Sequence, residues 1–164
     1  MGKVKKSVFE RNRLIYLTAI IISVISYYFL TQNIRLTLFP YKALIAFLYN
    51  MDFSFIENLG YMQSESLFAI SKSCLGVNLF LSLFLILIFG FYKKFKFIKN
   101  HVLRFSFFYF LALILAFVLT VIRISASVPF CRFDSFVLIH NIISLSIYFF
   151  SAMVLYYIME RVTK

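Results

Sequence analysis

The chain has 164 residues, of which 63% are hydrophobic and 21% aromatic, and 17 Lys and Arg against 6 Asp and Glu give a formal net charge of +11. A water-soluble domain of this size would leave too much apolar surface exposed, so the composition indicates an integral membrane protein with room for one compact helical unit. The basic residues cluster between apolar runs. This pattern is typical of membrane topology signals and argues against nucleic-acid binding.

Four apolar runs are long enough to cross a bilayer as helices, because about 17–25 residues are needed at a rise of about 1.5 Å per residue. The first run is long and no A-x-A-like site follows it, so a retained helix is expected rather than a cleaved signal peptide. The runs lack strict alternation and are too few for a barrel, so the predicted fold class is an all-α, polytopic membrane bundle. The predicted spans of this single membrane domain, residues 1–164, are 14–30, 75–92, 102–122 and 136–158.

The longest connection, residues 31–74, separates the first two predicted spans. Within it, residues 41–50 (YKALIAFLYN) follow Pro40 and are too short to span, so we expect an interfacial or re-entrant segment there. Residues 51–73 contain three acidic residues and predict an exposed loop with room for a short helix.

The distribution of Lys and Arg predicts the orientation of the chain. The N-terminal arm and the connection FYKKFKFIKN are densely basic, whereas the much longer first connection holds three basic residues. We therefore expect a multi-pass protein of the bacterial cytoplasmic membrane with both termini in the cytoplasm. The first and third connections would then lie on the outer face.

Three reactive side chains fall at a similar depth near that outer face. Cys74 immediately precedes the second span, Arg123 ends the third, and His140 lies about one turn inside the fourth. Ionisable groups in or beside a span are costly and usually face a partner or a wet cavity. Their convergence predicts a functional site.

These three residue types suit acyl transfer. Cys74 precedes a helix whose unsatisfied amides and dipole favour a thiolate nucleophile. His140 can accept the thiol proton and return it to a leaving amine as general acid/base. Arg123 keeps its proton and can hold a carbonyl or stabilise an oxyanion. No cofactor or metal is implied.

Each residue also has a plain structural interpretation. Cys74 can be a small buried side chain, Arg123 can snorkel as Arg104 can, and His140 can be a hydrogen-bonded bundle residue. Cys131, in VPFCRFD, would lie on the same face, so a structural Cys74–Cys131 disulfide is an alternative. Asp134 is a further candidate, to orient the His140 ring.

Three blocks of the sequence resemble the exosortase/archaeosortase membrane transpeptidases, and among them the short form called exosortase K. SKSCLGVNLF resembles the nucleophile block, LTVIRIS the arginine block and LIHNIISLSIYFFSAMVLYY the histidine block, and the resemblance extends over about residues 71–158. The chain departs from the family at three positions outside the triad. Leu75 stands where Ser is usual, Thr120 where Asn is usual and Ser144 where Gly is usual.

The resemblance implies a Cys74–Arg123–His140 triad and a cysteine peptidase or transpeptidase activity. The substrates would be exported proteins with a C-terminal sorting signal, which consists of a short motif, a transmembrane helix and a basic tail. Cleavage would give an acyl-enzyme that an unknown acceptor resolves. Small residues of the last span would let a substrate helix pack closely, although packing within the bundle explains them equally well: Ser144, Ser146, Ser151 and Ala152.

Three other classes of membrane protein are alternatives to this interpretation. A thiol oxidoreductase needs a reactive pair such as C-x-x-C, and the chain has two isolated cysteines. A proton-coupled exporter usually needs a carboxylate in the membrane, and the four predicted spans contain no Asp or Glu. A non-catalytic scaffold or subunit stays open, and it would tolerate replacement of all three polar residues.

The predicted orientation can be tested with a membrane-impermeant thiol reagent. In intact spheroplasts the reagent should label Cys74 or Cys131, because both are expected on the outer face. Labelling that appears only after lysis would mean that the topology is inverted.

Overall fold

The computed structural model describes residues 2–57, 59–63, 68–95, 97–133 and 135–163. Most of them are helical, and a small antiparallel sheet follows the second helix. The elements in chain order are α1 (Gly2–Gln32), α2 (Ile34–Tyr49), β1 (Phe53–Ile56), β2 (Gly60–Gln63), β3 (Ala69–Ile70), the 3₁₀ turn η1 (Lys72–Cys74), α3 (Val77–Ile86), the π-helical turn η2 (Leu87–Phe91), α4 (His101–Ser127), the 3₁₀ turn η3 (Val128–Phe130) and α5 (Phe136–Val162).

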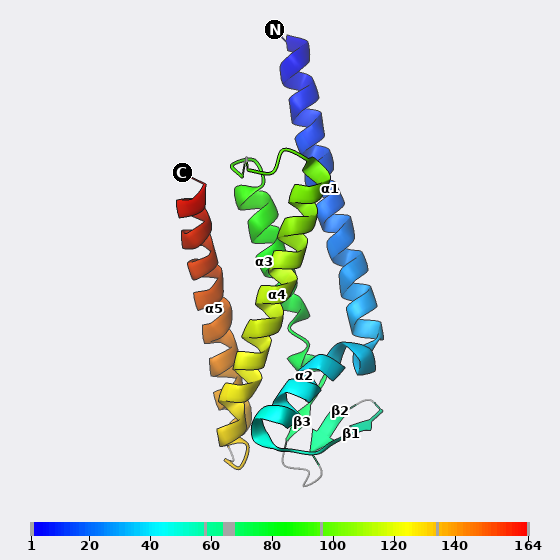
Figure 1. Ribbon diagram of the computed structural model, residues 1–164, viewed down its shortest axis with the longest axis vertical. Helices are drawn as coiled ribbons and strands as arrows, with labels where there is room; N and C mark the ends of the chain where they lie inside the picture. Colours follow the sequence, from blue (N-terminus) through cyan, green and yellow to red (C-terminus); the bar gives the residue numbers. More distant parts are fainter. Residues whose placement is uncertain (1, 58, 64–67, 96, 134, 164) are drawn as a thin grey trace.

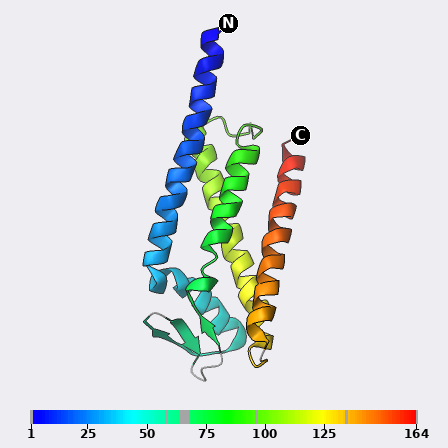
Figure 2. The ribbon, with the colours of Figure 1, turned by 180° about the vertical axis from the view of Figure 1, so that it is seen from behind.

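The long helices run side by side, and the ends of the bundle differ (Figures 1 and 2). Both chain termini and the connection from η2 to α4 lie at one end. We call the opposite end, which carries α2, the three strands and η3, the sheet end. This arrangement places the segment before α3, the end of α4 and the start of α5 close together.

Four helical segments are long and apolar enough to cross a membrane. The predicted all-α fold class with four membrane-length helices is therefore confirmed, and the chain is a multi-pass membrane protein. The four candidate spans are Arg13–Gln32, Lys72–Phe91, His101–Phe130 and Phe136–Val162.

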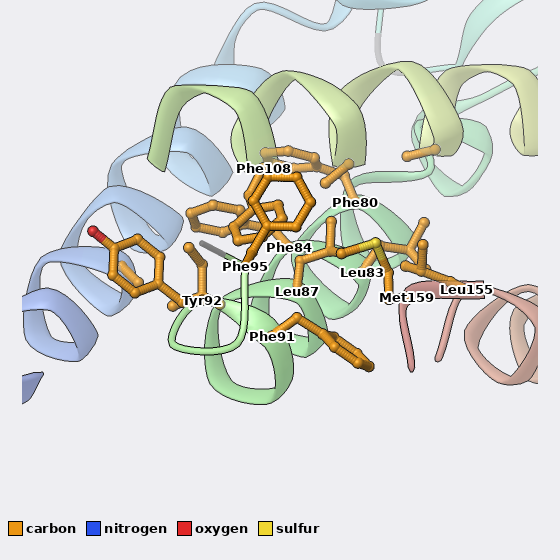
Figure 3. Packing of buried hydrophobic residues seen from close by; sticks show 14 of the residues in the cluster. Phe80, Leu83, Phe84, Leu87, Phe91, Tyr92, Phe95, Phe108, Leu155 and Met159 are labelled. Atoms are coloured by element: carbon orange, nitrogen blue, oxygen red, sulfur yellow. The ribbon is translucent and has the colours of Figure 1, made fainter. Parts of the chain in front are cut away.

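The helix α3 lies at the centre of the bundle. In its candidate span 61% of the residues are buried inside the protein, against 17% for the first span and 11% for the last. A helix that is apolar all round is expected in such a central place. Its aromatic residues pack with α4 and α5 in the main apolar cluster (Figure 3), which includes Phe80, Phe84, Phe91, Phe108 and Leu155.

Arg104 does not snorkel outward, as the sequence allowed, but turns into the protein. It is buried, its Nε and Nη2 donate to the Ile98 carbonyl oxygen, and its Nη1 donates to the Tyr92 carbonyl oxygen at 3.0 Å. The guanidinium carbon also lies 5.3 Å from the centre of the Tyr92 ring. Arg104 therefore fixes the connection between η2 and α4, because it binds a carbonyl group just after η2 and another within the connection.

The predicted interfacial segment 41–50 is the second half of a longer helix. α2 begins at Ile34 and continues through Pro40. Its buried residues Leu38, Tyr41 and Ile45 have helical spacing, and they pack in a second apolar cluster with Ile70 and Ile124. Burial of this face against α4 and the sheet explains why the helix tolerates the proline.

The exposed loop predicted for residues 51–73 is instead largely a three-stranded sheet in the order β1-β2-β3. The side chains of β1 alternate in burial, and edge-on aromatic contacts join Phe53 to Phe68 and Phe55 to Tyr61. The strands are short, so their period-two pattern is a weak signal in the sequence. The last strand leads directly into η1, so the sheet positions Cys74 next to α2.

Candidate active site

Cys74, Arg123 and His140 line one cavity of about 510 Å³ at the sheet end of the bundle. The segment before α3 supplies one wall, and α4 and α5 supply the others. The structure therefore brings together the three residues that the sequence singled out. Other lining residues are Ala69, Ser71, Ser73, Asn141, Ser144 and Tyr148.

Cys74 closes the 3₁₀ turn η1, and its side chain is 4% exposed. Its amide donates to the Ser71 carbonyl oxygen at 2.9 Å, and the next amide, that of Leu75, donates to Lys72 at 3.2 Å. These two bonds fix the backbone on both sides of the thiol. The helix α3 begins three residues later, so Cys74 lies just outside its first turn, as the sequence indicated.

Gly76 allows the chain to pass from η1 into α3. It has φ +63°, in the left-handed region that favours glycine, and a Cβ at this position would collide with the Thr120 hydroxyl oxygen. α3 and α4 therefore approach each other closely next to the turn that carries Cys74. This close approach requires glycine at position 76.

Tyr41 of α2 supports the same turn from the other side. Its hydroxyl donates to the Leu75 carbonyl oxygen at 3.3 Å. Burial, as the largest cause, raises the pKa of Tyr41 to about 12. The phenol consequently stays protonated at any physiological pH and remains a donor to Leu75.

Arg123 is 3% exposed and makes two hydrogen bonds to neutral oxygen atoms from other elements. Its Nη2 donates to the Ser73 carbonyl oxygen at 3.2 Å, and its Nη1 donates to the Tyr148 hydroxyl at 3.0 Å. The guanidinium carbon lies 5.8 Å from the centre of the Tyr148 ring. Arg123 is therefore tied to the residue before Cys74 and to α5, while part of its donor capacity remains available.

His140 of α5 is half-buried, and its ring is held on two sides. Its Nδ1 lies 2.9 Å from the hydroxyl oxygen of Ser127, which is fully buried on α4. The Phe136 ring lies against it with the ring centres 5.8 Å apart and the planes tilted by 32°. On the same helix, the Ser144 hydroxyl donates to the His140 carbonyl oxygen.

Of the two remaining candidates of the sequence, only Cys131 lies among the described residues, and it does not line this cavity. Cys131 is half-buried after η3, and both Cys131 and Cys74 are free thiols, so the alternative of a Cys74–Cys131 disulfide is not realised. Asp134, the candidate for orienting His140, lies outside the described residues. Of the two thiols, Cys131 is the more exposed and should react faster with a thiol reagent.

Two residues of the site were not singled out from the sequence. Ser127 lies four residues after Arg123 on α4, and Tyr148 lies eight residues after His140 on α5. At these spacings the side chains share a helix face, so helical periodicity could have identified both. The Ser73 carbonyl carries no side-chain signal and could not have been found in this way.

A second cavity, of about 300 Å³, adjoins the same turn and shares Ser73 and Tyr148 with the first. It lies between α1, α3 and α5, and its lining includes Tyr27 and Lys72. The turn that carries Cys74 therefore separates two cavities.

Comparisons of the chain with protein-family profiles, with curated proteins and with solved structures find no match.

The close approach at Gly76 predicts a large difference between two glycine substitutions. Gly76→Ala should lower the free energy of unfolding by about 2 kcal/mol or more, because it adds backbone strain and a collision with Thr120. Gly90→Ala is the matched control, since a Cβ there meets no atom within 4 Å. Unfolding of the purified variants in mixed micelles, followed by circular dichroism, measures both values.

Equal stability of the two variants would contradict the packing described for Gly76. In the Gly76→Ala background, Thr120→Ala should recover part of the loss, because it removes the hydroxyl that the new methyl group meets.

Proposed function

We propose that the chain is a membrane-embedded cysteine peptidase or transpeptidase that resembles the exosortase/archaeosortase enzymes. It cleaves the C-terminal sorting signals of exported proteins at the outer face of the bacterial cytoplasmic membrane. One observation carries the proposal: a thiol, a guanidinium and an imidazole from three separate segments line a single cavity.

Each of the three groups has a role in acyl transfer. The Cys74 sulfur attacks a peptide carbonyl carbon while His140 takes the thiol proton, and the carbonyl oxygen becomes an oxyanion. When the tetrahedral intermediate collapses, the carbon–nitrogen bond breaks and His140 gives its proton to the leaving amine. The product is a thioester between Cys74 and the substrate, which an acceptor amine or hydroxyl, or water, then cleaves.

Arg123 supports the attack in two ways. Its bond to the Ser73 carbonyl oxygen holds the nucleophile turn, and its charge stabilises the oxyanion in a site from which lipid excludes most water. Tyr148 fixes the guanidinium from the opposite side. A planar group with several donors can hold both partners and still face the substrate, which a single ammonium group cannot do.

The position of the cavity favours a substrate that is anchored in the membrane. Val137 and Leu145 line the cavity and are 69% and 73% exposed, so the cavity reaches the side of α5 where lipid would lie. A substrate with its own transmembrane helix can approach along this side by lateral diffusion. Four small residues of α5 are only half-buried, so they can pack against a substrate helix or within the bundle: Ser144, Ser146, Ser151 and Ala152.

The second cavity offers a place for the acceptor. It adjoins Ser73, next to the nucleophile, but lies on the other side of the turn. An acceptor that enters there approaches the thioester without passing through the space that the acyl group occupies. The identity of this acceptor decides between transfer and hydrolysis.

The nucleophile assignment is tested by replacing each cysteine. Cys74→Ala should abolish processing of a co-expressed substrate that carries a sorting signal, because no other group in the cavity can form the thioester. Cys131→Ser is the matched control and should process the substrate at the parental rate, since Cys131 does not line the cavity. Immunoblotting of precursor and product measures both; equal processing by Cys74→Ala and the parent would favour a non-catalytic scaffold.

The arginine assignment is tested by a substitution that keeps the charge. Arg123→Lys should lower the rate of processing by about 100-fold, because one ammonium group cannot bind Ser73, Tyr148 and an oxyanion together. Arg161→Lys, an exposed change at the other end of α5, is the control and should leave the rate unchanged. Near-parental activity of Arg123→Lys would mean that a positive charge alone is sufficient.

A further inference from the structure

Among the described residues, only Ser127 forms a hydrogen bond with a ring nitrogen of His140. Its side chain is fully buried, and it lies one turn after Arg123 on α4. The hydroxyl oxygen is 2.8 Å from the Arg123 carbonyl oxygen and 2.9 Å from His140 Nδ1. Both contacts are of normal hydrogen-bond length.

The direction of these two bonds follows from the number of protons. A carbonyl oxygen can only accept, and a serine hydroxyl carries one proton, so Ser127 donates that proton to Arg123. The Ser127 oxygen must then accept the second bond, which requires a proton on His140 Nδ1. In the neutral ring, a proton on Nδ1 leaves Nε2 with a free lone pair.

We infer that Ser127 is a positioning residue that holds His140 in the Nδ1–H tautomer, so that Nε2 is the atom that receives the Cys74 proton. The role of Nε2 as base rests on the proposed function, whereas the tautomer follows from the hydrogen bonds alone.

The same bond fixes the orientation of the ring. If the ring turned by half a revolution, a carbon atom would replace Nδ1 opposite Ser127, and the hydrogen bond would be lost. The contact with Phe136 restricts the ring from another side. His140 is therefore held in one orientation as well as in one tautomer.

The proton balance of acylation is consistent with this arrangement. Nε2 takes the thiol proton while the sulfur–carbon bond forms, and it gives that proton to the leaving amine when the carbon–nitrogen bond breaks. In both steps Nδ1 keeps its own proton and donates it in the hydrogen bond to the Ser127 oxygen. The ring consequently changes its charge without changing its hydrogen-bond partner, and no oxidant or reductant is needed.

Nitrogen NMR of the full chain in detergent micelles tests the tautomer directly. The chain has two histidines, so ¹⁵N-histidine labelling together with His101→Gln isolates the His140 signals. At a pH where the ring is neutral, the parent should show a protonated Nδ1 and an unprotonated Nε2. Ser127→Ala should move the population towards Nε2–H, and Ser127→Thr, which keeps a hydroxyl, should restore the parental spectrum.

Ser23→Ala is the matched control. Ser23 is also buried, and its hydroxyl donates to the carbonyl oxygen of Ala19, four residues earlier, at 2.8 Å. Its removal should leave the His140 signals unchanged. A parent with Nε2–H, or a Ser127→Ala variant that keeps full Nδ1–H, would overturn the inference.

Kinetics separate this inference from the proposed function. If Cys74 processes a sorting signal, Ser127→Ala should lower kcat by about 10-fold or more with little change in KM, and Ser127→Thr should recover most of the loss. A parental kcat in Ser127→Ala together with a changed tautomer would overturn the role of Nε2 as base. If the parent processes no substrate but the tautomer responds to Ser127 as described, the proposed function is wrong and the positioning of His140 by Ser127 stands.

Discussion

Burial of a guanidinium in an apolar bundle costs free energy unless its donors find acceptors. Arg123 meets this requirement through Nη1 and Nη2, which donate to the Tyr148 hydroxyl of α5 and to the Ser73 carbonyl oxygen before α3, whereas its buried Nε has no partner among the described residues. The bonds connect three elements that are far apart in the sequence. Because both acceptors are neutral, they do not cancel the positive charge, which remains available to a negatively charged group in the cavity.

The surroundings of Arg123 all serve to hold the same short turn. Tyr41 binds the Leu75 carbonyl oxygen from α2, and Gly76 lets α3 approach α4 at Thr120. The main apolar cluster lies towards the termini and fixes the helices, whereas the second cluster lies beneath the cavity at the sheet end. The protein therefore combines a rigid helical body with a polar end built from short elements.

The sequence was sufficient for the helices but not for the parts that join them. Membrane-length apolar runs predicted the four long helices, and charge and spacing predicted that Cys74, Arg123 and His140 meet. The sheet has strands of only two to four residues, which give too weak a pattern to predict, and α2 continues through Pro40, a residue that predicts a helix boundary. The inward turn of Arg104 and the role of the Ser73 carbonyl depend on backbone groups that leave no mark in the sequence.

Because Val137 and Leu145 are exposed at the wall of the cavity, the concentration of a binding partner has to be expressed for the membrane and not for the aqueous solution. A site that opens sideways between helices meets molecules dissolved in the bilayer, so their concentration there is a number per area of membrane. Added lipid dilutes such a partner, whereas added water does not. Rates measured in micelles or vesicles should therefore be compared at equal mole fraction in the lipid phase, and not at equal bulk molarity.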